Sequence, residues 1–206
     1  MGSIHGRIVR IVTLAVGLAL MVTAGIIAWT NWPRPVHVGT VPQTFAPATG
    51  KDSQTVAQVA LEPQYLKIPA LHVNAPIEPV GIDPAGSLGV PDSPAVVGWW
   101  AGGPRPGSAV GTAVIDGHVD TAAYGPGALF NLRSLQPGDE IVVEGTAKSV
   151  HFRVAALREY DKASLPTSDI FSQSVSGRLV IVTCGGAFDH ITRHYRDNIV
   201  AYAVPD

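Results

Sequence analysis

Leu179-Val180-Ile181-Val182-Thr183-Cys184-Gly185-Gly186 is a run of five strand-forming residues followed by a cysteine and two glycines. β-Branched residues and leucine over this length predict a buried β-strand, and the paired glycines are expected to end it in a turn. Cys184 would then lie where the strand ends. It is the only cysteine among 206 residues, so it cannot form an intrachain disulfide. A lone cysteine is either a small buried apolar residue or a nucleophile, and the rest of the chain decides between them.

A second apolar strand ends in a similar way 66 residues earlier in the chain. Ala113-Val114-Ile115 leads into Asp116-Gly117, and His118 follows at once. A thiol needs a base or a cation beside it to be nucleophilic at neutral pH, and histidine titrates in that range. Either residue alone would more often be structural. Together, His118 and Cys184 predict a catalytic pair.

Two arginines after the cysteine are candidates for a third catalytic group. Acyl transfer needs a donor for the oxyanion that develops on the attacked carbonyl, and a guanidinium can supply it. Arg196 lies three residues before the final β-type run, which begins at Ile199, so strand pairing is expected to hold it. Arg193 lies in the middle of a polar stretch. We therefore predict Arg196 as the oxyanion donor.

The N-terminal region predicts a membrane anchor. Residues 11–29 carry no charge, and Arg7 and Arg10 precede them. This length spans roughly 28 Å as a helix, close to the hydrocarbon thickness of a bilayer. Residues 1–30 are therefore expected to form a cytoplasmic N-terminus and a transmembrane helix. The basic flank places the N-terminus in the cytoplasm and the remainder of the chain outside the cell. A cleaved signal peptide is the alternative, but the apolar run is longer than a usual signal core.

The rest of the chain divides into a linker and one domain. Residues 31–62 are rich in proline, threonine and glutamine and predict an extended extracellular tether. Residues 63–206 contain short β-type runs separated by Gly and Pro, which predict an all-β sandwich or closed barrel. These runs are Tyr65–Ile68, Ala75–Val80, Gly111–Ile115, Glu140–Glu144, His151–Leu157, Leu179–Thr183 and Ile199–Val204. One helix is expected over Ala128–Leu135, where leucine recurs every third residue. The net charge of −2 and the lack of a basic stripe argue against a nucleic-acid partner.

These residues resemble the sortases, the membrane-anchored cysteine transpeptidases of Gram-positive bacteria. The resemblance covers most of residues 65–204 and rests on a small set of motifs. They are Ile68-Pro69, Gly98-Trp99-Trp100, Pro106-Gly107, Gly117-His118-Val119-Asp120, Gly127-Ala128-Leu129-Phe130 and Thr183-Cys184-Gly185-Gly186. The sequence Tyr195-Arg196-Asp197-Asn198 and the two glycines after the cysteine are most similar to the actinobacterial class F type.

The resemblance implies a closed eight-stranded β-barrel with short helices and a site on its outer face. It implies that Cys184 attacks the Thr–Gly bond of a Leu-Pro-x-Thr-Gly sorting signal on a surface protein. His118 would serve as acid and base, Arg196 would stabilise the oxyanion, and Thr183 would lie against the substrate. The acceptor would be water or the amine of a cell-wall precursor or pilin. We expect no cofactor and no metal.

Two other interpretations remain open from the sequence. Cys184, His190 and His194 have a spacing that a metal site can use, although a fourth ligand is not evident. The second alternative is a non-catalytic, membrane-tethered extracellular β-domain. A domain of that kind would be expected to have lost Cys184, His118 or the arginines, and all of them are present.

Overall fold

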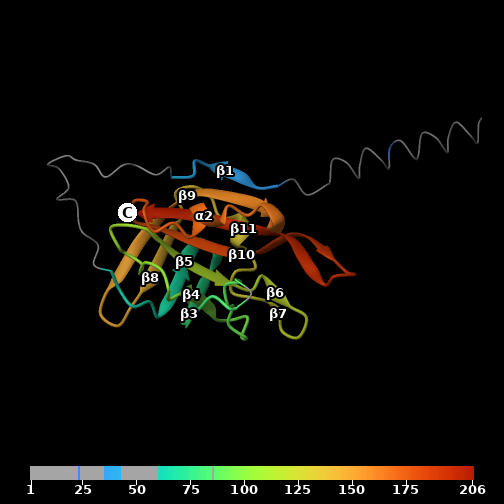
Figure 1. Cartoon of the computed structure of the whole chain (residues 1–206), viewed down its shortest axis with the longest axis horizontal. Coiled ribbons are helices and arrows are strands. Elements are labelled where there is room, and N and C mark those ends of the chain that lie inside the picture. The colour runs from blue at the N-terminus through green and yellow to red at the C-terminus, as the bar shows by residue number, and fades with distance from the viewer. Residues whose placement is uncertain (1–22, 24–34, 43–59, 85) are drawn as a thin grey trace, which may run out of the picture. The chain divides into compact units, whose positions relative to one another are not determined.

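The apolar runs of the sequence pair into one sheet that curls until its two ends meet (Figure 1). The computed structural model describes residues 23, 35–42, 60–84 and 86–206, and the sheet lies within the compact unit Pro35–Asp206. The strand order is β1-β9-β11-β10-β5-β4-β3-β2-β8, and β8 also pairs with β9. This last pairing closes the eight strands other than β1 into a barrel, so the predicted closed eight-stranded barrel is confirmed.

The elements are short apart from the last three barrel strands. The barrel consists of β2 Tyr65–Ile68, β3 Val73–Val80, β4 Val97–Trp100, β5 Thr112–Gly117, β8 Glu140–Glu144, β9 Ser149–Asp161, β10 Arg178–Asp189 and β11 His194–Pro205. The remaining strands are β1 His37–Gly39, β6 Asp120–Thr121 and β7 Gly125–Pro126. Short helices lie in the connections, at η1 Pro69–Leu71, η2 Leu132–Ser134, η3 Lys162–Ser164 and α2 Thr167–Ile170.

Side chains of β10 alternate between the interior of the barrel and its outer face. Leu179 and Ile181 are fully buried in the main core inside the barrel. Val180 belongs to a second apolar cluster on the outer face, together with Tyr202 of β11 and Ile170 of α2. Because successive residues of a strand point to opposite faces, Cys184 and Val182 are on the same outer face as Val180. The outer face of β10 and β11 is therefore apolar here and is covered by α2.

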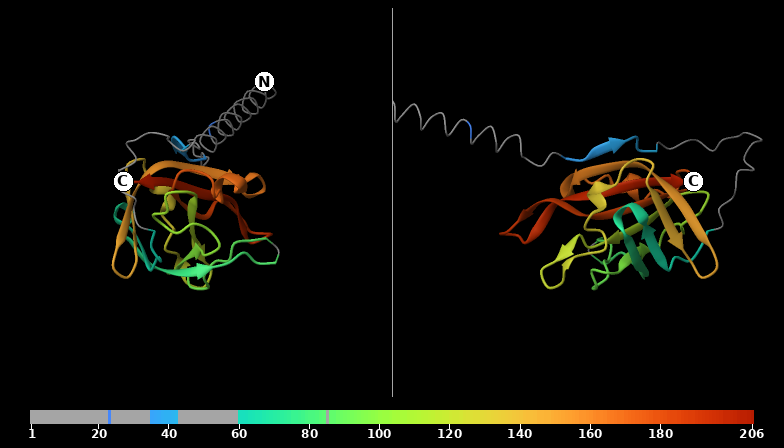
Figure 2. Two further views of the ribbon diagram at one scale, coloured as in Figure 1. Left: turned by 60° about the vertical axis from the view of Figure 1, so that its left-hand side comes forward. Right: turned by 180° about the vertical axis from the view of Figure 1, so that it is seen from behind.

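Strand β10 continues past the glycines that were predicted to end it. It runs through Gly185 and Gly186 to Asp189, and its end projects with β11 beyond the barrel (Figure 2). The register between the two strands shifts between Gly185 and Phe188, and Gly186 has a φ of 73°. Glycine adopts this left-handed conformation without strain, so the glycines form a bulge inside the hairpin. The predicted turn directly after Cys184 is therefore wrong.

The predicted helix over Ala128–Leu135 is reduced to the 3₁₀ turn η2, Leu132–Ser134. The leucines at 129, 132 and 135 are all fully buried. A 3₁₀ segment has three residues per turn, so side chains three apart lie above one another. The three-residue spacing of the leucines therefore fits tight turns at the end of the barrel, and the prediction of an α-helix is wrong.

Part of the predicted linker is attached to the barrel. Strand β1 pairs with β9 through His37 and Arg158, and the backbone amide of Val36 donates a hydrogen bond of 2.9 Å to Glu159 Oε2. Arg178 Nη1 donates to the carbonyl of Pro42 at 3.1 Å. These contacts make residues 35–42 a strap along the outside of β9 and not a free tether.

The predicted membrane anchor, residues 11–29, lies outside the described residues except for Thr23. Within the described part of the chain, no helix has the length and apolar character needed to cross a membrane.

Candidate active site

Strands β5 and β10 lie side by side and parallel, and their pairing brings the two chemical motifs together. Gly117 of β5 is the register partner of Thr183 of β10. The Thr183 hydroxyl also donates a hydrogen bond of 2.8 Å to the Gly117 carbonyl. His118 directly follows the end of β5 at Gly117, and Cys184 follows Thr183 within β10. Since neighbouring strands are about 4.8 Å apart, the two residues lie next to each other at the same end of the barrel.

Strand β11 adds the arginine on the other side of β10. Asn198 is the register partner of Cys184, and both line the same groove. Arg196 lies two residues before Asn198 on β11, so alternation along the strand places it on the same outer face. Its side chain is exposed. Cys184 and Arg196 thus lie on the adjacent strands β10 and β11, and His118 directly follows the end of β5, on the other side of β10.

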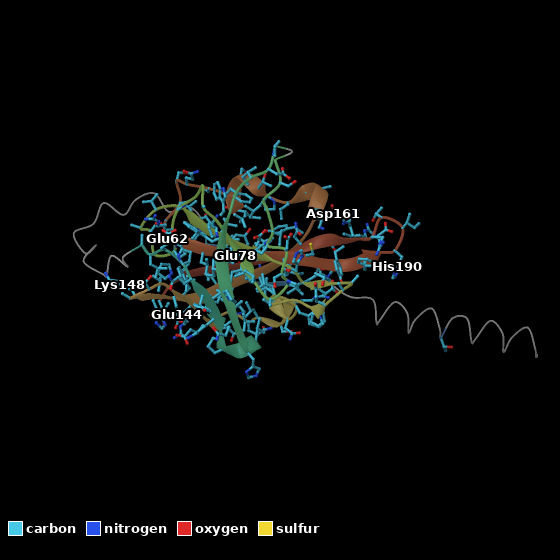
Figure 3. All side chains as sticks on the ribbon, turned by 90° about the horizontal axis from the view of Figure 1, so that it is seen from below. Glu62, Glu78, Glu144, Lys148, Asp161 and His190 are labelled. Atoms are coloured by element: carbon cyan, nitrogen blue, oxygen red, sulfur yellow. The ribbon has the colours of Figure 1, made fainter. Side chains whose placement is uncertain are left out.

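Arg193 has a different position. It lies in the turn of the β10–β11 hairpin with a φ of 60°, and its amide donates a hydrogen bond of 2.7 Å to the Asp189 carbonyl. His190 lies in the same turn and is at the far end of the hairpin in Figure 3. Arg193 is therefore part of the projecting turn, whereas Arg196 lies on the paired strand closer to Cys184.

The thiol of Cys184 has a cation beside it. Cys184 is half-buried, and Lys162 Nζ lies 3.5 Å from its Sγ. Lys162 begins η3, directly after β9, where the Asp161 carboxylate accepts a hydrogen bond from the amide of Ala163 at 2.8 Å. Asp161 lies at the end of β9 in Figure 3, near the base of the hairpin. No sequence pattern indicated Lys162, because this contact depends on how the β9–β10 connection folds back over β10.

His118 is oriented by the loop that precedes β4. Its Nε2 lies 3.0 Å from the carbonyl oxygen of Pro91, which can only accept a hydrogen bond. Nε2 therefore carries a proton, and Nδ1 is the nitrogen without one when the imidazole is neutral. Among the described residues, Cys184 makes its side-chain contact with Lys162 and has no hydrogen bond to His118.

Thr183 has a structural role in the barrel. It is 4% exposed, and its hydroxyl is used in the bond to Gly117. It nevertheless belongs to the residues that line the groove beside Cys184. Its contribution to substrate contact therefore stays a prediction.

A large groove of about 710 Å³ extends along the outer face from Cys184. We call it the Cys184 groove. It is lined by Ile82, Gly86, Ser87, Leu88, Val90, Trp100, Asp116, Gly117, Lys162, Leu165, Thr167, Ile170, Phe171, Val182, Thr183, Cys184 and Asn198. Most of these side chains are apolar, and the ring of Trp100 packs edge-on against Phe171 with their centroids 5.1 Å apart. The groove is therefore suited to a peptide with small or apolar side chains.

Asp116 is the acidic residue of the Cys184 groove. It is 7% exposed, and its Oδ1 has no hydrogen-bond partner among the described residues. Burial raises the pKa of Asp116 from 3.8 to about 7, and a backbone hydrogen bond opposes this shift. The sequence contained one signal for this residue, a carboxylate within the otherwise apolar run of β5.

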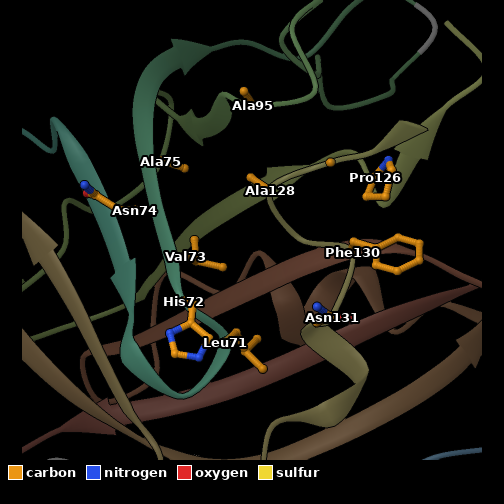
Figure 4. A pocket seen from close by; sticks show the side chains of 11 residues that line it. Leu71, His72, Val73, Asn74, Ala75, Ala95, Pro126, Ala128, Phe130 and Asn131 are labelled. Atoms are coloured by element: carbon orange, nitrogen blue, oxygen red, sulfur yellow. The ribbon is translucent and has the colours of Figure 1, made fainter. Parts of the chain in front are cut away.

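A second pocket, of about 370 Å³, lies between the η1–β3 segment and the segment that follows β7 (Figure 4). His72 is the one ionisable side chain among its lining residues, and no cysteine lines it. The chemistry predicted from the sequence is therefore concentrated at the Cys184 groove.

The alternative metal site does not form. His194 begins β11, and the ring of His190 packs edge-on against Phe188 with their centroids 5.2 Å apart. Within the described residues, no three His, Cys, Asp or Glu side chains are placed to hold a metal ion. Cys184, His190 and His194 thus share a region of the hairpin without converging on one point.

The comparisons with known proteins identify the family and agree with the fold. A family model described as the sortase domain matches residues 66–206. The structure of sortase E1 from Streptomyces coelicolor, which holds a tripeptide in its active site, is 22% identical, with a TM-score of 0.54 and coverage of 71% of this chain and 88% of that one. The comparison with curated proteins finds no match.

Two further solved structures have the same fold. Sortase C-1 from Actinomyces oris is 17% identical with a TM-score of 0.52, and the match covers 91% of this chain and 98% of that one. The sortase D5 transpeptidase of Clostridium perfringens is 19% identical with a TM-score of 0.51, covering 69% of this chain and 77% of that one.

Proposed function

The chain belongs to the sortase family of cysteine transpeptidases, and we propose that it cleaves a Leu-Pro-x-Thr-Gly-type sorting signal between Thr and Gly and transfers the acyl group to an amine. The observation that supports this proposal is the Gly117–Thr183 register, because His118 and Cys184 directly follow these two partners and Cys184 lines the groove. Arg196 follows on the next strand.

The proposed reaction has two acyl-transfer steps. The Cys184 thiolate attacks the Thr carbonyl, and the oxyanion that forms is stabilised by Arg196. The C–N bond to Gly then breaks as protonated His118 gives its proton to the leaving amine, and a thioester remains on Cys184. An incoming amine attacks the thioester, His118 accepts the proton of that amine, and the thiolate leaves. Water in place of the amine gives hydrolysis.

The neighbours of the catalytic residues support these roles. The bond from Nε2 of His118 to Pro91 leaves Nδ1 as the nitrogen that exchanges the proton. The ammonium of Lys162 lies 3.5 Å from Sγ and places a positive charge beside the proposed nucleophile. The mainly apolar lining of the Cys184 groove accommodates the Leu and Pro side chains of the signal.

Partners and location are also part of the proposal. The substrates are surface proteins that carry a C-terminal sorting signal, and the acceptor is a cell-wall precursor or a pilin amine. Residues 11–29 anchor the chain in the cell membrane with the barrel outside. A full-length protein that stays in the membrane fraction after a high-salt wash, with its original N-terminus, is expected. Soluble protein that begins near Gly25 would show a cleaved signal peptide instead.

We also assign the chain to class F, on Gly185-Gly186 and on Tyr195-Arg196-Asp197-Asn198. This finer assignment concerns the choice of sorted proteins and acceptor and leaves the chemistry unchanged.

The test is incubation of the full chain with a quenched Leu-Pro-x-Thr-Gly peptide, with and without an added amine, followed by mass spectrometry. We expect a peptide ending in Thr without the amine and the Thr-amide product with it. A Cys184→Ala variant, checked for folding by circular dichroism, should form neither product. Turnover at the wild-type rate by that variant would exclude Cys184 as the nucleophile and overturn the proposal. No cleavage by the wild type would also overturn it and leave a non-catalytic tethered domain.

A further inference from the structure

Asp116 has an unsatisfied carboxylate oxygen in the floor of the Cys184 groove. It is 7% exposed, and its Oδ1 has no hydrogen-bond partner among the described residues. Buried polar atoms in folded proteins are nearly always paired, and an unpaired one lowers stability. A residue of this kind in a groove beside a nucleophile is an acceptor that a bound ligand can satisfy.

The neighbouring strand leaves space for this carboxyl group. Gly98 of β4 is the register partner of Asp116. A Cβ atom at Gly98 would lie 2.6 Å from Asp116 Oδ1 and 2.9 Å from both methyl groups of Val80. Any larger residue at 98 would therefore displace the carboxyl group, so the glycine is what allows an acid at this point of the floor.

No charge within the groove neutralises Asp116. Lys162 is the other charged side chain that lines it, and its ammonium contacts the sulfur of Cys184. Among the described residues, no side chain that lines the groove donates a hydrogen bond to Asp116 Oδ1. The acceptor is therefore available to a ligand.

The position of Asp116 relative to Cys184 indicates which part of the substrate reaches it. Asp116 is the register partner of Val182, two residues before Cys184 on β10. Two residues of a strand span about 7 Å. An extended peptide with its scissile carbonyl at Cys184 covers the same distance with the two residues before the Thr.

We propose that Asp116 is a specificity-determining residue that accepts a hydrogen bond from a donor carried by one of the two peptide residues before the Thr. This inference rests on the proposed function and deepens it. The donor is either the side chain of the variable residue x or a backbone N–H at the position before x, where proline has none. Both sources supply the same chemistry, an N–H or O–H directed at Asp116.

The experiment measures peptide binding to the full chain carrying Cys184→Ala, so that the result does not depend on turnover. Three fluorescent peptides are compared: Leu-Pro-Ala-Thr-Gly, Leu-Pro-Gln-Thr-Gly and Leu-Ala-Ala-Thr-Gly. The second adds a side-chain donor at x, and the third adds a backbone N–H at the position before x. We expect one of these two to bind at least about tenfold more tightly than the first, as a hydrogen bond to a buried carboxyl group typically provides.

Adding Asp116→Ala should reduce this preference to within about twofold, and Asp116→Asn, which keeps the shape and one acceptor oxygen, should retain part of it. Glu78→Gln is the matched control. Glu78 is the register partner of Gly98 on its other side, but it is exposed and does not line the groove (Figure 3). The preference should be unchanged in this variant.

Equal binding of all three peptides, or a preference that persists in both Asp116 variants, would overturn the inference. Cleavage assays with the wild type then separate it from the proposed function. An enzyme that cleaves all three peptides with equal kcat/KM keeps the function and loses the inference. A protein that binds selectively through Asp116 and cleaves none keeps the inference and loses the function.

Discussion

The hydroxyl of Tyr195 donates a hydrogen bond to Asp120 Oδ2 at a distance of 2.6 Å, across 75 residues of sequence. Asp120 is two residues after His118, and Tyr195 is directly before Arg196. The bond therefore joins the segment that carries the histidine to the strand that carries the arginine, over the strand that carries Cys184. This hydrogen bond, with burial as the next cause, raises the pKa of Tyr195 to about 12, so the phenol stays protonated and remains a donor.

We predict that Tyr195→Phe lowers kcat/KM about tenfold, mainly through kcat. A hydrogen bond to a charged group contributes about 1.5–3 kcal/mol, and its loss frees both catalytic segments to move from their productive geometry. Steady-state kinetics with one peptide gives kcat and KM separately. A change in KM alone would show that the bond serves substrate binding and does not position the catalytic groups.

Asp120→Ala and the double variant complete the analysis of this bond. If both residues act through this hydrogen bond, the losses in kcat/KM from the two single changes should not add in the double variant. Additive losses would mean that Tyr195 and Asp120 act separately. Asp120→Asn keeps an acceptor oxygen and should therefore lose less activity than Asp120→Ala.

The two arginines should differ sharply in their effect on activity. Arg196 lies on β11 two residues before Asn198, the register partner of Cys184, and a donor held in place before the reaction lowers the barrier. We expect Arg196→Ala to lower kcat/KM by at least about a hundredfold, as loss of one oxyanion donor does. Arg193, in the hairpin turn, should contribute less than about tenfold, or roughly 1.4 kcal/mol. Both variants are measured on the same peptide, and a larger loss at Arg193 would reverse the assignment.

Lys162 should increase the reactivity of Cys184 by a modest factor. Its Nζ lies 3.5 Å from Sγ, but the lysine side chain is exposed, and water and salt weaken the attraction. Lys162→Met should slow alkylation of Cys184 by iodoacetamide at pH 7 roughly threefold at low salt. The difference from wild type should shrink in 1 M salt.

Lys148→Met is the control for this prediction, because Lys148 is exposed in the turn between β8 and β9, far from the hairpin in Figure 3. Alkylation in this variant should match the wild type. If Lys162→Met also matches it at low salt, the contact between Nζ and Sγ has no effect on the thiol.

The parts of the site that could be predicted from the sequence are the short motifs made of residues adjacent in the chain. In Gly117-His118 and Thr183-Cys184 an apolar strand pattern leads to a side chain that can take part in chemistry, and the adjacency of the two motifs follows once β5 pairs with β10. The continuation of β10 was not predictable, because paired glycines normally mark a turn. Here β11 also pairs with the part of β10 that follows Gly186, so the two glycines form a bulge within the strand.

The contacts that surround the nucleophile depend on tertiary structure. Lys162 reaches Cys184 only because the β9–β10 connection folds over the outer face, and Tyr195 meets Asp120 only once the barrel has formed. The acid in the middle of β5 was visible in the sequence, but its lack of a partner depends on Gly98 of another strand. Local patterns contain no information on such pairings, so these residues emerge only from the fold.

The buried carboxyl of Asp116 should make stability depend on pH in a specific direction. Burial raises its pKa from 3.8 to about 7, so between these values the folded protein holds a proton that the unfolded chain has lost. The free energy of unfolding therefore falls as pH rises through this window, and the fall is complete above about pH 7. At about 1.4 kcal/mol per pKa unit, the upper bound of the loss is about 4 kcal/mol.

The Asp116→Asn substitution introduces a side chain that is neutral at every pH and has nearly the same shape. The variant should therefore not show this fall in the free energy of unfolding. We expect the free energy of unfolding of the variant, minus that of the wild type, to increase from pH 4 to pH 7 and then to level off. Urea denaturation followed by tryptophan fluorescence measures both proteins. Subtraction of the wild-type values cancels the contributions of the titratable groups that both proteins share. A flat difference for Asp116→Asn would show that this carboxyl group ionises in the folded protein as it does in water.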